Sequence, residues 1–159
     1  EPQLVEAARG NLGGLVRRFI DATYEQSASS RVVRVAEALQ TLWPDYPPVR
    51  DAMATYREGR LQQYVPLFRS LADAYALRVR PHVDIAAISW AFNGLHARHV
   101  VEQLAGQHPV YVDQQGQEWT LAAYNCLMLV AGACTDTDGA PLSPEQLAER
   151  PAVRPLMLG

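Results

Sequence analysis

Two histidines three positions apart are the residues of this chain that most directly suggest chemistry. His96 and His99 lie in the stretch NGLHARHV, and Glu102 follows three positions after the second histidine. On an α-helix this spacing places all three side chains on roughly one face. Imidazole and carboxylate groups placed together can bind a metal ion, exchange protons or sense pH. Which of these applies depends on the helix that carries them and on what that helix packs against.

A metal site is the weakest of these alternatives. Structural metal sites usually recruit ligands from a second element, and nothing in the sequence fixes the approach of His82 or His108, which lie in breaks flanking the helix. We therefore predict no metal ligand, no cofactor and no catalytic residue. His96 is a candidate polar group of a ligand pocket, more so than His99. The alternative for both is a histidine packed in the interior or at an interface.

Length, composition and charge are those of one globular domain. The chain has 159 residues, of which 48% are hydrophobic and 19% charged, and its net charge is −3. An acidic balance argues against these residues being the main contact to nucleic acid, because phosphate binding needs clustered basic charge. Cys126 and Cys134 are eight positions apart in one predicted helix, about 12 Å, which is too far for a disulfide. Without a visible signal peptide or an apolar run of ~20 residues, we expect a cytoplasmic protein with no membrane partner.

Apolar residues recur with a period near 3.6 along nearly the whole chain, which predicts an all-α fold. We expect about five or six helices, and the segments are 4–25, 31–43, 49–77, 85–105, 119–134 and a short helix over 144–150. Pro66 is expected to kink or break the third of these. The predicted domain covers residues 1–135, and residues 136–159 form a loop, the short helix and a proline-broken tail.

Short polar motifs refine this assignment. Asp84 can cap the start of the helix over 85–105, and Ser143 followed by Pro144 can start the last helix. The alternation at residues 110–112 permits a short extended piece or a hairpin.

The predicted helices 85–105 and 119–134 are apolar on more than one side. In the first, one face carries Ile88, Phe92 and His96, and another carries Trp90, Val101 and small residues that allow close approach. A helix with two apolar faces must bury both. One face can pack on its own domain while the other packs on a second copy, so we predict a homodimer through these two helices. The alternative is a central helix buried entirely within one chain.

Residues 38–104 resemble the C-terminal domain of TetR-family transcriptional regulators. The similar features are a long Arg- and Ala-rich helix with YREGR, a short break at LRVRPHVD, and the helix AAISWAFNGLHARHVVEQ with Gly94 at its middle, followed by a final apolar helix. The resemblance implies an all-α ligand-binding and dimerisation domain. In that family the last two long helices form a four-helix bundle across the dimer.

The resemblance also implies a function. The chain would be the effector domain of a ligand-responsive repressor and would bind a small apolar or aromatic molecule. Family members carry a DNA-binding helix-turn-helix of roughly fifty residues before this domain, and this chain begins about where that module would end. Operator DNA is therefore expected as a partner only through an N-terminal module that these residues do not include.

Aromatic residues on different helices are the candidates for the effector pocket. Pockets between helices are typically apolar and aromatic with a few placed polar groups. The candidate ligand-binding residues are Tyr24, Trp43, Tyr56, Tyr64, Phe68, Trp90, Phe92, Asn93 and His96. Tyr64 and Phe68, one turn apart around Pro66, are the preferred pocket wall. For each aromatic residue the alternative is an ordinary core position.

Two other functions fit the same sequence. One is a helical enzyme without a DNA-binding module, which would use His96 or a tyrosine as acid or base on a small metabolite. The other is a structural dimerisation module with no ligand.

Overall fold

The described part of the chain is mostly helical. The computed structural model describes residues 10–31, 35 and 45–155. In these residues the longer elements are α2 (Leu12–Ser29), α4 (Pro47–Ala74), α5 (Ile85–Leu104), α6 (Leu121–Ala133) and the short α7 (Pro144–Ala148). Strands β1 (Arg78–Val79), β2 (Val110–Val112), β3 (Glu118–Thr120) and β4 (Cys134–Thr135) form two small sheets. The predicted helical class is confirmed.

Most element boundaries lie close to the predicted ones. α5 spans 20 residues and begins at Asp84, whose carboxylate accepts a hydrogen bond from the backbone N–H of Ala86. Ser143 starts α7 with reciprocal side-chain and backbone hydrogen bonds to Gln146. The extended piece at 110–112 is half of a hairpin, in which Tyr111 pairs with Trp119.

Three of the predicted helices differ from the structure or lie outside its described residues. The helix predicted over 31–43 falls almost wholly outside the described residues. A break at Pro66 is wrong, because α4 continues through this residue. Pro66 is exposed, and the loss of the hydrogen bond that its N–H would make does not end the helix. α2 also continues past the predicted end at residue 25, to Ser29.

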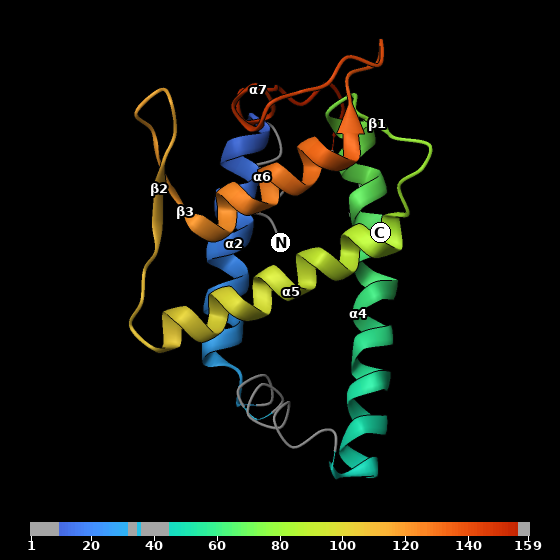
Figure 1. Ribbon diagram of the computed structural model, residues 1–159, viewed down its shortest axis with the longest axis vertical. Helices are drawn as coiled ribbons and strands as arrows, with labels where there is room; N and C mark the ends of the chain where they lie inside the picture. Colours follow the sequence, from blue (N-terminus) through green and yellow to red (C-terminus); the bar gives the residue numbers. More distant parts are fainter. Residues whose placement is uncertain (1–9, 32–34, 36–44, 156–159) are drawn as a thin grey trace.

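The helices form two crossed layers. α5 and α6 lie side by side in front of α2 and α4, and α5 contacts both of the rear helices (Figure 1). α7 covers one end of the bundle and packs against α2 and α6. No helix in the described ranges is both long and apolar enough to cross a membrane.

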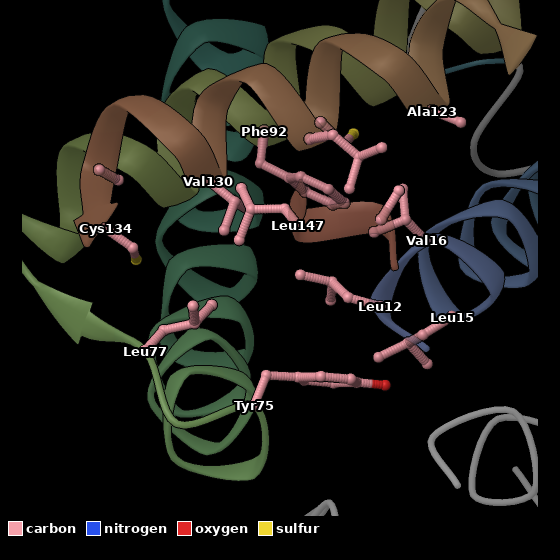
Figure 2. Close-up of a cluster of buried hydrophobic side chains, with 14 of the residues drawn as sticks. Leu12, Leu15, Val16, Tyr75, Leu77, Phe92, Ala123, Val130, Cys134 and Leu147 are labelled. Atoms are coloured by element: carbon pink, nitrogen blue, oxygen red, sulfur yellow. The ribbon is translucent and has the colours of Figure 1, made fainter. Parts of the chain in front are cut away.

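The buried core draws on both ends of the described chain. Leu12, Ile20, Tyr75, Leu127 and Leu147 are fully buried, and Figure 2 shows Leu147 beneath α6 beside Leu12. Leu147 belongs to the segment that the sequence predicted as a loop, short helix and tail. α7 therefore belongs to the same core as α2 and α6.

Arg150 fastens the end of α4. Its guanidinium donates to the carbonyl oxygens of Tyr75 at 2.6 Å and Ala76 at 2.9 Å, and to the Asp136 carboxylate at 2.6 Å. Ala76 has a φ of 49°, a left-handed conformation that is costly for alanine. The hydrogen bond from Arg150, with a second from the backbone N–H of Thr137, holds the pKa of Asp136 down at about 2. The arginine thus stabilises the turn between α4 and β1.

Gly13 is the position where packing is closest. A Cβ at this residue would lie 2.9 Å from Cη2 of Trp119 and 3.0 Å from the carbonyl oxygen of Ala148. The ring also carries the Arg17 guanidinium, 3.7 Å from its centroid, and its Nε1 donates to Asp113. α2 can approach the indole and α7 this closely only because residue 13 has no side chain.

Gly13→Ala should lower the free energy of unfolding by about 1–3 kcal/mol, because neither the ring nor the α7 backbone can move without loss of packing. Urea unfolding at fixed protein concentration measures the change. Gly59→Ala is the control, since no atom lies within 4 Å of its added Cβ; it should raise helix stability by up to about 1 kcal/mol. Equal stability of Gly13→Ala and the unchanged chain would contradict this packing.

Candidate functional site

Four aromatic rings meet where α2, α4 and α5 converge. Phe92 of α5 lies at the centre, with its ring centroid 5.4 Å from Phe19 of α2 and 5.6 and 5.4 Å from Tyr64 and Phe68 of α4. Tyr64 and Phe68 meet it edge to face, a favoured arrangement because the ring edge is positive and the ring face negative. These rings form a closed aromatic cluster that holds three helices together.

The cluster contains three of the predicted pocket residues. Tyr64, Phe68 and Phe92 do come together, and the i, i+4 spacing of the first two places both on the face of α4 toward α5. Phe19, the fourth member, was not among the predicted residues. Its place in the apolar stripe of α2 was visible in the sequence, but nothing there distinguished it from an ordinary core residue.

α5 divides the other candidates between its two faces. His96 follows Phe92 by one turn, lies on the inward face and is 5% exposed. Trp90 is two residues before Phe92, about 200° around the helix, and lies on the outward face with 38% of its surface exposed. Asn93 is half-buried between them. Of His96 and Trp90, which were both candidates for the pocket, His96 faces the interior.

The remaining candidates lie apart from the cluster. Tyr24 contacts the ring of His99, with centroids 6.0 Å apart. Tyr56 is half-buried on the first half of α4. Trp43 lies outside the described residues.

His99 is buried between α2 and α5. It is 4% exposed, and burial lowers its pKa below the usual 6.5. The carboxylates of Glu102 and Asp21 oppose that shift, and His108 adds to it. The Glu102 carboxylate accepts a hydrogen bond from Arg98 at 2.6 Å. His99 is therefore a packed, preferentially neutral histidine.

The HARH motif does not assemble a metal site with its described surroundings. Among residues 10–31, 35 and 45–155, no group of three His, Cys, Asp or Glu side chains is placed to hold an ion. His96 and His99 instead contribute buried surface to the packing of α5.

An apolar crevice lies next to the aromatic cluster. It lies where α4, β1, α5 and the end of α6 meet, and its lining comprises Phe68, Leu71, Ala72, Val79, Ile85, Ile88, Val130, Ala133 and Cys134. The space is about 10 Å³, room for one water-sized group. Phe68 belongs to both features, so its ring is the wall between the crevice and the cluster.

Cys134 is the one lining residue with a polar atom on its side chain. Burial raises the pKa of its thiol, and the positive charge of Arg80 opposes that rise. The side chain points from the end of α6 into the interior (Figure 2). A buried thiol of raised pKa is a poor nucleophile, so the crevice is suited to holding apolar groups.

A second hollow is polar and open to solvent. It lies between the hairpin turn and α7, has a volume of about 450 Å³, and is lined by Gln114, Gln115, Ser143, Glu145, Gln146 and Glu149. At its edge the hydroxyl of Tyr124 donates to Glu145 at 2.9 Å. The ring of Tyr111 stacks on Tyr124 with centroids 4.0 Å apart, which anchors the hairpin to α6.

Acidification should destabilise the fold through His99. Because its folded pKa lies below the unfolded value near 6.5, the unfolded chain binds more protons, and stability falls as pH drops from 6.5 toward the folded pKa. We expect His99→Gln to reduce the slope of unfolding free energy against pH in this window. Urea unfolding at a series of pH values measures the slope, and exposed His82→Gln is the control. An unchanged slope in His99→Gln would show that His99 titrates normally.

Comparison with known proteins assigns no family. No family model matches the chain, and neither a curated protein nor a solved structure matches it. The TetR resemblance is therefore an expectation from the sequence alone.

Proposed function

We propose that this chain is the effector-binding and dimerisation domain of a ligand-responsive, TetR-like transcriptional regulator, most simply a repressor. The observation that carries the proposal is an exposed apolar surface on the outer side of α5 and α6, opposite the side that packs on α2 and α4. We call it the outer face. The resemblance described above provides the regulatory function, and the outer face supports the dimer that such a function requires.

Residues of two helices form the outer face. On α5 it comprises Trp90, Val101 and Leu104 with Ala87, Ala91 and Gly94; on α6 it comprises Leu121, Met128 and Gly132. Exposed Arg98, which pairs with Glu102, is a charged residue on the same side of α5. Met128 is 52% exposed. Small residues between larger ones let a second helix approach closely, as ridges pack into grooves.

The outer face is smaller than a standard interface but of the same order. α5 has 20 residues and is about 30 Å long, α6 has 13 residues and is about 20 Å long, and two strips ~10 Å wide present ~500 Å². Standard interfaces bury ~800 Å² per partner. A two-fold contact between outer faces would form a four-helix bundle from α5 and α6 of each copy.

The aromatic cluster could couple ligand binding to the arrangement of the dimer. Phe92 packs against α2 and α4 from the inner side of α5, while Trp90 and Val101 lie on its outer side. A ligand that separates α4 from α5 would move α5 and so alter the interface. It would shift the equilibrium between two dimer arrangements only by its difference in affinity for them. DNA-binding modules joined to α2 would then change their separation.

The dimer is tested by native mass spectrometry and sedimentation at micromolar concentration. We expect a dimer, and we expect Met128→Glu and Val101→Glu to give monomers, because a charge at the centre of an apolar interface is desolvated without a partner. Val110→Glu is the control, since Val110 is equally exposed but lies on the hairpin. Circular dichroism checks that each variant folds. A monomeric unchanged chain would contradict the dimer.

Regulation is tested on the full-length gene product. A compound that co-purifies with the protein and is identified by mass should, at saturation, weaken binding to DNA flanking the gene by tenfold or more. Unchanged DNA affinity would refute the repressor function. If the chain is instead the enzyme named as the alternative, it would convert the compound into a product. Mass spectrometry of the compound after incubation with the protein would detect the product as a change of mass.

A further inference from the structure

Two glycines inside helices lie on the outer face although the packing of the chain itself does not require them. Gly94 is at the middle of α5, Gly132 is near the end of α6, and both are exposed. A Cβ added at either one would meet no atom of the described residues within 4 Å, and neither has a positive φ. Glycine inside a helix is less stable than alanine. Close approach by a second backbone would account for both glycines.

Gly59 of α4 has the same open surroundings but a different kind of neighbour. The exposed residues one helical turn away from it, Thr55, Gln62 and Gln63, are polar. Exposed Trp90 and Ala91 stand at the corresponding distance from Gly94. The apolar setting therefore distinguishes Gly94 and makes Gly59 a matched control.

The exposed side of α5 is complementary to itself about Gly94. Its exposed residues recur every three or four positions and form one stripe; they are Ala87, Trp90, Ala91, Gly94, Arg98, Val101 and Leu104. When two copies of α5 pack antiparallel with Gly94 at the centre, each residue meets the one equally far on the other side of the partner's Gly94. Val101, seven positions after Gly94, then packs on the partner's Ala87, seven positions before it. A large side chain faces a small one, as ridges fit grooves.

Arg98 favours the same centre. Its side chain is 71% exposed and pairs with Glu102. In an antiparallel pair centred on Gly94, its guanidinium lies over the turn of the partner that carries Trp90, whose surface is 38% exposed. A guanidinium stacks favourably on an indole face. The two Arg98 residues are then about 12 Å apart along the helices, whereas a centre close to Arg98 would bring two positive charges together.

Close approach also brings the contact nearer to the size that a stable dimer needs. The outer face presents ~500 Å², and a standard interface buries ~800 Å² per partner. At a glycine, helices come together more closely than at larger residues. The aliphatic part of Arg98 and half-buried Ala97 therefore enter the contact as well.

We propose that α5 packs antiparallel on α5 of a second copy with Gly94 at the two-fold axis, and that Arg98 of each copy stacks on Trp90 of the other. Phe92 lies two positions before Gly94, on the opposite side of α5, so the aromatic cluster is directly behind the axis. A ligand that moves α5 at the cluster would act on the centre of the dimer contact. This inference rests on the proposed function, because it concerns the dimer that the function requires.

Disulfide cross-linking locates the axis. Gly94→Cys should form a covalent dimer under mild oxidation, because residues at a two-fold axis meet their own copies. Ala87→Cys alone should not, since its two copies would be about 21 Å apart. It should cross-link after subunit exchange with Val101→Cys. Ala52→Cys, exposed on α4, measures chance collisions, and the unchanged chain, whose two cysteines are buried, gives the background.

The mixed cross-link decides the outcome, because a side chain at residue 94 can itself disturb the contact. Native mass spectrometry of the reduced variants reports whether they are dimers. A dimer in which Ala87→Cys and Val101→Cys cross-link no faster than Ala52→Cys would overturn the register and leave the proposed dimer standing. A monomeric unchanged chain would overturn both.

Gly94→Leu should weaken the dimer by roughly tenfold or more, because its side chain would be forced between the two helices. Leucine also favours a helix more than glycine does, so the variant should stay folded, which circular dichroism checks. Gly59→Leu is the control and should leave the dimer unchanged. A Gly94→Leu dimer as tight as that of the unchanged chain would overturn the close approach at this residue.

A double-mutant cycle of Arg98→Gln and Trp90→Leu tests the stack. The two residues are about 12 Å apart along α5 of one copy, so coupling between them in the dimer dissociation constant has to cross the interface. We expect the double variant to be about threefold tighter than independent effects would give. Arg69→Gln, exposed on α4, is the control for the loss of one positive charge. Independent effects of the two changes would overturn the stack.

Discussion

The contact of Phe92 with rings from two other helices is the interaction on which the rest of the fold depends. α2 and α4 lie in the rear layer, and the aromatic cluster joins both of them to α5. α6 then packs beside α5 and α2, and α7 closes the end against α2 and α6. Any compound that enters beside Phe68 must disturb these ring contacts, so ligand entry and helix position are physically linked.

Periodicity predicted the elements well where the pattern is local. The bounds of α5 and the caps at Asp84 and Ser143 follow from side-chain spacing and short-range hydrogen bonds, which a sequence displays directly. The periodicity of the sequence could not show which apolar face of α5 is buried, because Phe92 and Trp90 are both large and apolar. Only packing against α2 and α4 distinguishes them. The predicted break at Pro66 was wrong because α4 continues through this residue. Pro66 faces solvent, and that position depends on tertiary structure.

The candidate site was predictable in part for the same reason. Tyr64 and Phe68 share a helix face, and their meeting with Phe92 required only that α4 and α5 pack. The crevice could not be predicted, since its residues Val79 and Cys134 are 55 positions apart and are paired by two-residue strands that have no periodic pattern. The nine predicted residues therefore include Phe68, which lines the crevice, but none of its other lining residues.

Arg150 has a consequence for how the chain acquires its fold during synthesis. The turn that it fastens at Tyr75 is 75 residues earlier in the chain, and Leu147, which completes the core, is equally late. While the chain is being synthesised, α4 can form, but its C-terminal end lacks the hydrogen bonds from Arg150. The apolar surfaces of α2 and α6 that α7 covers in the folded protein stay exposed. A nascent chain stalled before this point would expose the surfaces that chaperones bind, whereas a few more residues would bury them.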